Sequence, residues 1–183
     1  MSHDNPLIFL IDTLFDIYIA IVLLRFLLQQ VGADFFNPIS QFIVKATQKP
    51  VVIARRIIPS FRGIDLASLS LAVLLIFIKL IILLALGGIQ PSISALLIQS
   101  LYDLIQLTFD IFIFAIFVQA ILSWVNPDPY NPVSALLNSL TRPILQPIKK
   151  RLPLIGGLDL STIVALIGLM FIKRVVLYIF TLF

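Results

Sequence analysis

Long apolar runs alternate with polar segments along this chain. The runs cover residues 7–28, 66–89, 98–125 and 158–183, and two long polar segments cover residues 29–64 and 126–157. Each run has the roughly 20 residues that a helix needs to cross about 30 Å of hydrocarbon. The first run is too long for a signal peptide, and no Lys or Arg precedes it. We therefore predict an all-α membrane protein with four transmembrane helices.

Composition supports the bilayer as the solvent and argues against an enzyme. Of the 183 residues, 60% are hydrophobic and 12% are charged, which lies far outside the range of soluble domains. The chain has no Cys and one His, His3, which excludes thiolate and imidazole metal clusters and Ser–His or Cys–His nucleophiles. No phosphate-binding or dinucleotide-binding glycine motif is present. We expect no catalytic residues, no metal and no cofactor.

The basic residues predict the topology. The N-terminus, the loop "GGIQPS" and the C-terminus carry no Lys or Arg outside the predicted helices, whereas the two polar segments carry nine. These nine are Lys45, Lys49, Arg55, Arg56 and Arg62 in the first segment, and Arg142, Lys149, Lys150 and Arg151 in the second. By the positive-inside rule, both segments are cytoplasmic and both termini face outward. The net charge of +4 therefore reflects membrane topology rather than nucleic-acid binding.

The chain contains an internal repeat with an offset of 94 residues. The motif "DFFNP" at residues 34–38 returns as "DPYNP" at residues 128–132. The same offset pairs Thr47 with Thr141, and "FIK" at residues 77–79 with "FIK" at residues 171–173, without a gap. We predict two tandem units, residues 1–89 and 90–183, each consisting of a helix, a basic segment and a second helix. Because each unit crosses the membrane twice, the two repeats are parallel.

Each Asn-Pro motif is typical of a helix start, with Asn37 or Asn131 as the N-cap and Pro at the first helical position. The apolar residues that follow recur at i, i+3, i+4 and i+7, with Ser40 among the polar residues between them. Prolines then interrupt the pattern. We interpret residues 37–62 and 131–155 as broken amphipathic helices on the inner leaflet, with their basic residues near anionic headgroups. An ordinary cytoplasmic loop and a re-entrant segment are the alternatives.

Further polar residues have structural interpretations at this stage. Asp65 and Asp159 follow "GI" and "GL" and are expected to cap the next helix. Arg25, near the inner end of the first apolar run, is expected to extend to the headgroups. The small residues Ser68 and Ala72, like their counterparts in the second repeat, favour close helix packing.

Ionisable residues at membrane depth form a predicted layer. Asp16 and Asp110 each lie 14 residues before the inner end of their helix, and Lys79 and Lys173 each lie 14 residues after Asp65 or Asp159. All four are then about 21 Å from the cytoplasmic boundary. We hypothesise that each Asp pairs with a Lys, within or across repeats. A structural pair is favoured over an ion or proton path, because one pair per repeat is few for conduction.

The segments "DFFNPISQFIVKATQKPV", "RRIIPSFRGIDLASL" and "DPYNPVSALLNSLTRPILQPIKKRLPLIGGLDLST" closely resemble the two repeats of YggT-family (YlmG-like) membrane proteins. The first repeat departs from the pattern at "TQKP", where the second has "TRP". The resemblance implies a multi-pass protein of the bacterial inner membrane. It also implies links to osmotic-stress tolerance and potassium homeostasis, to cell division and nucleoid organisation and, in plastid relatives, to cytochrome complex assembly. It implies no catalytic residue.

Two functions fit this sequence. The first is a non-enzymatic scaffold or assembly factor whose basic segments bind inner-leaflet lipid or a partner protein. The second is an oligomeric channel-like or transporter-like protein that affects ion balance, since four helices from one chain rarely enclose a pore.

Overall fold

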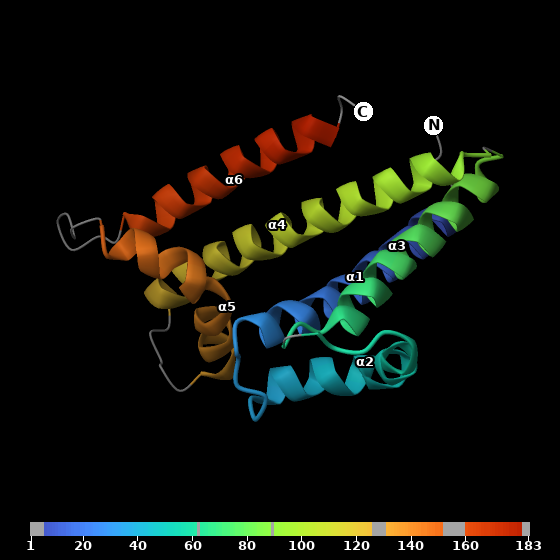
Figure 1. The fold of residues 1–183 in the computed structure, drawn as a ribbon. Coiled ribbons are helices and arrows are strands. Elements are labelled where there is room, and N and C mark those ends of the chain that lie inside the picture. The colour runs from blue at the N-terminus through green and yellow to red at the C-terminus, as the bar shows by residue number, and fades with distance from the viewer. Residues whose placement is uncertain (1–5, 62, 89, 126–130, 152–159, 181–183) are drawn as a thin grey trace. The chain divides into compact units, whose positions relative to one another are not determined.

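The computed structural model describes residues 6–61, 63–88, 90–125, 131–151 and 160–180 (Figure 1). These residues form six helices and one isolated bridge between Phe61 and Ile64. Four of the helices are long and apolar enough to cross a membrane: α1 (Pro6–Gln30), α3 (Leu66–Leu86), α4 (Ile93–Val125) and α6 (Ser161–Phe180). The predicted class is confirmed: the chain is an all-α membrane protein.

Local chemistry explains where two helix ends differ from the prediction. Helix α4 begins at Ile93, five residues before the predicted start, because the Ser92 hydroxyl accepts a hydrogen bond from the Ala95 amide and acts as a cap. Helix α3 ends at Leu86, before Gly87 and Gly88. Gly88 adopts a φ of 70°, a left-handed conformation that ends a helix at little cost for glycine.

Two shorter helices, α2 (Pro38–Ile57) and α5 (Pro132–Lys149), follow the Asn-Pro motifs. The side chains of Asn37 and Asn131 accept hydrogen bonds from the Ile39 and Val133 amides, each at 2.9 Å. These bonds satisfy amide groups that have no partner in the first turn of a helix. The Asn37 side-chain amide also donates to the Pro132 carbonyl at 2.7 Å, so the first Asn-Pro motif contacts the start of α5.

The prediction that prolines break these helices is wrong. Pro50 lies within α2, and Pro143 and Pro147 lie within α5, and both helices continue through them. A proline cannot donate to the carbonyl four residues earlier, which for Pro50 is that of Ala46. The Tyr18 hydroxyl of α1 lies 3.4 Å from the Ala46 carbonyl and donates to it. A neighbouring helix thus supplies the donor that the proline lacks.

The chain forms two compact units, which we describe separately. Unit 1 contains residues 1–26 and 43–107, and unit 2 contains residues 27–42 and 108–183. In unit 1, the buried side chains include Ile19, Leu23, Ile43, Val51 and Ile76. In unit 2, Ile116 of α4, Leu145 of α5 and Ala165 of α6 form a buried cluster. The units do not coincide with the predicted repeats at residues 1–89 and 90–183, which are defined by sequence similarity and stay a prediction.

A polar corner joins α2 to α3 in unit 1. Asp65 is fully buried and accepts hydrogen bonds from the Ser68 hydroxyl at 2.6 Å and from the Ser68 amide at 3.4 Å. Arg55 of α2 donates to the same carboxylate at 2.8 Å. Burial alone would raise the pKa of Asp65, but the hydrogen bonds from Arg55 and Ser68 outweigh burial and lower it. Sequence reasoning expected the cap and missed the ion pair.

Replacing Asp65 by Asn is expected to lower the free energy of unfolding by about 1.5–3 kcal/mol, the range for hydrogen bonds to charged groups. Because the folded pKa is lowered, the ionised form contributes stability above the unfolded pKa of about 3.9 and loses it as the pH falls through the folded value. Thermal unfolding of the purified protein in detergent, followed by circular dichroism across acidic pH, measures both effects. Arg56→Gln, next to Arg55 but without this contact, is the control. An acid profile that is the same for Asp65→Asn and the wild type would contradict the assignment.

Candidate functional site

The predicted intramembrane layer consists of two ion pairs, one in each repeat. The Lys79 ammonium of α3 donates to Asp16 of α1 at 2.6 Å, and the Lys173 ammonium of α6 donates to Asp110 of α4. Each pair therefore joins the two spanning helices of one repeat rather than crossing between repeats. The carboxylates are the more open partners, since the side chains of Asp16 and Asp110 are 55% and 46% exposed.

The first repeat has an extra acid at this layer. Lys79 also lies 3.2 Å from Asp12, one turn before Asp16 on α1. The position equivalent to Asp12 in the second repeat is Gln106, which carries no charge. Asp103, on α4, accepts a hydrogen bond from Gln99 of its own helix at 2.7 Å. Lys79 thus has two carboxylate partners.

The expectation that Arg25 extends to the headgroups is wrong. Arg25 is 5% exposed, and its guanidinium reaches α2 instead. It donates to the Thr47 hydroxyl at 2.9 Å, the Val44 carbonyl at 3.2 Å and the Gln48 side-chain oxygen at 3.1 Å. Thr47 in turn donates to the Ile43 carbonyl at 2.7 Å. This polar cluster attaches the amphipathic helix to the C-terminal part of α1.

The second repeat builds the equivalent cluster with its charge on the other helix. The offset of 94 residues relates Arg25 to Gln119 of α4, and Gln48 to Arg142 of α5. Gln119 hydrogen-bonds the Thr141 hydroxyl and donates to the Asn138 side chain at 2.6 Å. Arginine and glutamine have therefore exchanged positions between the repeats, while the threonine is the same in both. Within the described residues, nothing accepts a hydrogen bond from Arg142.

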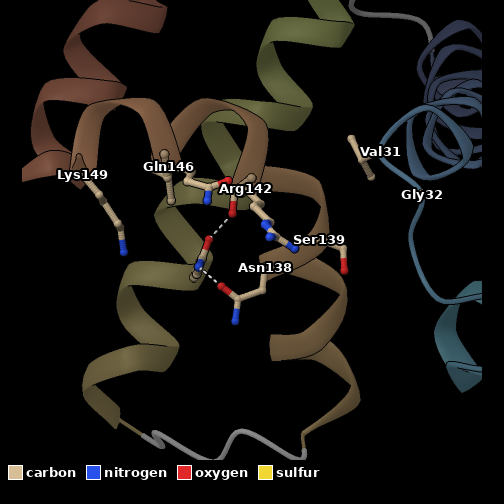
Figure 2. Close-up of a pocket in the computed structure, with 10 residues that line it drawn as sticks. Val31, Gly32, Asn138, Ser139, Arg142, Gln146 and Lys149 are labelled. Atoms are coloured by element: carbon tan, nitrogen blue, oxygen red, sulfur yellow. Dashed lines mark hydrogen bonds between the residues drawn. The ribbon is translucent and has the colours of Figure 1, made fainter. Parts of the chain in front are cut away.

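An open cavity of about 450 Å³ lies beside this second cluster, entirely within unit 2 (Figure 2). Figure 2 shows Asn138 and Arg142 close together on α5. The lining residues are Val31, Gly32, Gln119, Asn138, Ser139, Thr141, Arg142, Leu145, Gln146 and Lys149. The described residues that line the cavity include two cations and several neutral donors but no carboxylate. Such a lining favours an anion.

Comparison with known proteins agrees with the duplicated unit. The CCB3/YggT family model matches twice, over residues 5–86 and 98–180. The chain belongs to the CCB3/YggT family. It contains two tandem YggT repeats.

Several curated bacterial proteins are similar to this YggT-family chain over most of its length. An uncharacterized protein of Pseudomonas aeruginosa, PA0392, is 48% identical over 95% of this chain and 89% of the relative. A protein from the proC 3' region of Vibrio alginolyticus is 44% identical over 91% of each chain. The uncharacterized protein YggT of Escherichia coli is 38% identical over 87% of this chain and 83% of the relative. No solved structure matches.

In the first YggT repeat, α2 has three distinct sides. One side is buried against the protein and consists of Ser40, Ile43, Thr47 and Val51. A basic side is exposed and consists of Lys45, Lys49 and Arg56. An apolar side is also exposed and consists of Ile53 and Ile57, and exposed Phe42 lies where the apolar and basic sides meet, seven residues before Lys49. A helix with both an exposed apolar side and a basic side is typical of the membrane interface.

Two positions on α2 differ from the prediction. Ser40, expected on the polar outer side, is fully buried, and within the described residues its hydroxyl has no hydrogen-bond partner. Arg55, expected to face lipid or a partner protein, is 39% exposed and bound to Asp65. The other basic positions of the second repeat, Arg142, Lys149, Lys150 and Arg151, are exposed. Asp159, the predicted cap of the last helix, lies outside the described residues.

Sequence reasoning found the charged layer but missed the clusters around Arg25 and Gln119. One signal was available: the offset that revealed the repeat also pairs Arg25 with Gln119 and Gln48 with Arg142. Such an exchange of residue types between two positions indicates that the positions face each other. Among the described residues, no group of three or more His, Cys, Asp or Glu side chains could hold a metal ion.

The extra acid beside Lys79 predicts unequal sensitivity of the two ion pairs. Asp110→Asn leaves Lys173 without its carboxylate, whereas Asp16→Asn leaves Lys79 with Asp12, so Asp110→Asn is expected to destabilise more. In double-mutant cycles with Lys79→Met and Lys173→Met, we expect a coupling energy of about 0.5–3 kcal/mol in each repeat. Thermal unfolding in detergent provides the measurement. Strictly additive effects would show that the paired side chains are not coupled.

Proposed function

We propose that this protein is a non-enzymatic scaffold or assembly factor of the bacterial inner membrane, with a role in stress tolerance. Its amphipathic helices bind the anionic inner leaflet or a partner protein at that surface. In this proposal both termini face the periplasm, because the basic residues outside the spans gather in the two segments that contain α2 and α5. The single observation that carries it is the arrangement of α2. Its inner side is held by α1, and its apolar and basic sides remain available to lipid.

The physical basis is the complementarity of these sides to the interface. Exposed Phe42, Ile53 and Ile57 supply apolar surface for the boundary between headgroups and acyl chains. Lys45, Lys49 and Arg56 supply positive charge, each worth about 1 kcal/mol near an anionic surface. The hydrogen bonds from Arg25 hold α2 against α1, so the helix need not leave the protein to reach the lipid.

An oligomeric protein that affects ion balance is the second candidate. The observation that favours it is the exposure of Asp16 and Asp110 on helices that are long and apolar enough to span the membrane. Carboxylates in a span usually face protein or water rather than lipid. A homo-oligomer would supply such a partner surface. Potassium flux into liposomes that disappears in Asp16→Asn or Asp110→Asn would favour this candidate over the scaffold.

Site-directed spin labelling tests the interfacial position of α2. The natural sequence has no Cys, so each single-Cys variant carries one label. In nanodiscs that contain phosphatidylglycerol, labels at Ile53→Cys and Ile57→Cys are expected to be more accessible to oxygen than to a water-soluble nickel chelate. A label at Lys45→Cys, on the basic side of the same helix, is expected to show the reverse order. Water access at all three positions would support a cytoplasmic loop, and oxygen access at all three a re-entrant segment; either outcome would overturn the proposal.

A further inference from the structure

We propose that the cavity beside α4 and α5 binds the phosphate group of one anionic phospholipid, with Arg142 as its main ligand. This inference rests on the proposed function, because it places α5 at the inner leaflet. It goes further by assigning a discrete site to one repeat rather than a diffuse attraction to both.

The cavity has the chemistry of a phosphate site. The Arg142 guanidinium can form two parallel hydrogen bonds to a phosphate, and no described side chain occupies it as an acceptor. The side chains of Asn138, Ser139 and Gln146 add neutral donors to the lining, and Lys149 adds a second positive charge. None of the described lining residues is acidic.

In the first repeat, the protein places its own cation at the position equivalent to Gln119. There Arg25 lies at the position of Gln119, and its guanidinium is buried among acceptors from α2. The neighbouring position on α2 is the uncharged Gln48. In the second repeat, the shorter Gln119 replaces the arginine, and the cation moves to Arg142 at the cavity. The exchange converts a buried arginine with protein partners into an exposed one that is open to a ligand.

A lipid fits this place better than a free phosphate ion. The lining also contains the apolar side chains of Val31 and Leu145, which suit the glycerol and upper acyl region better than water. A phospholipid phosphate is held at the depth of an interfacial helix, so its effective concentration there is far higher than that of a dissolved ion. We therefore assign the site to an anionic lipid headgroup.

The decisive variant is the double exchange Gln119→Arg with Arg142→Gln, which rebuilds the arrangement of the first repeat and leaves the net charge unchanged. Native mass spectrometry of the full-length protein in detergent, titrated with phosphatidylglycerol or with phosphatidylcholine, counts the bound lipids. We expect the wild type to bind one phosphatidylglycerol in preference to phosphatidylcholine. We expect the exchange to weaken that binding by about tenfold or more, consistent with losing a charged hydrogen bond.

Single variants keep the test valid if the double exchange fails to fold, which thermal unfolding would reveal. Arg142→Gln and Arg56→Gln each remove one exposed positive charge from an amphipathic helix, but only Arg142 lines the cavity. Arg142→Gln is expected to lose the retained lipid, and Arg56→Gln to keep it. Arg142→Lys, which keeps the charge without the paired donors, is expected to be intermediate.

Several outcomes would overturn the inference. Equal lipid loss in Arg142→Gln and Arg56→Gln would indicate diffuse attraction and leave the proposed function intact. Displacement of the bound lipid by millimolar inorganic phosphate, with the phosphate itself retained, would assign the site to a free anion. Unchanged lipid binding in Arg142→Gln would exclude Arg142 as the ligand and overturn the inference. Failure of the proposed function would appear separately, as water access at the spin labels on α2.

Discussion

Hydrocarbon offers no hydrogen-bond partner, so a polar group near a membrane-spanning helix must find its partner within the protein. Most of this structure follows from that constraint. Thr47 satisfies its hydroxyl with the Ile43 carbonyl and with Arg25 of the neighbouring spanning helix. The Tyr18 hydroxyl donates to the Ala46 carbonyl, to which Pro50 cannot donate because it has no amide hydrogen. Deeper in the span, each lysine meets an aspartate from the facing helix. Polar contacts, rather than apolar burial alone, set how the amphipathic helix lies against its repeat.

The two repeats meet this constraint with different residues. At the intramembrane layer, Asp12 gives Lys79 a second carboxylate, whereas the equivalent Gln106 is neutral. Beside the amphipathic helix, arginine and glutamine occupy opposite helices in the two repeats. In each case the helices and their order are retained while the charge changes. The duplicated fold therefore provides one shared scaffold on which the copies have acquired distinct surfaces.

The fold could largely be predicted from the sequence, because hydropathy and the positions of basic residues indicate which segments lie in the bilayer and which lie in water. Run lengths predicted the four spans, and matched spacing predicted the residues of both Asp–Lys pairs. Contacts of long side chains could not be predicted in this way. The sequence does not show which partner the long side chain of Arg25 has, and only the fold shows that acceptors on α2 surround it. Pro50 was expected to break its helix because proline lacks an amide donor. The donor that replaces it, the Tyr18 hydroxyl, lies 32 residues away in sequence and could not be predicted. Arg55 had no sequence signal separating it from Arg56, although only Arg55 reaches Asp65.

The hydrogen bond from Asn37 to the Pro132 carbonyl bears on the origin of the duplication. It joins the Asn-Pro motif of one repeat to that of the other, although 95 residues separate them. A chain with a single repeat could make this bond only with a second molecule. Fusion of two copies makes the same contact intramolecular, so it no longer depends on protein concentration. In such a fused chain each copy can change without having to remain complementary to an identical partner, which is the freedom that divergence between the two halves requires.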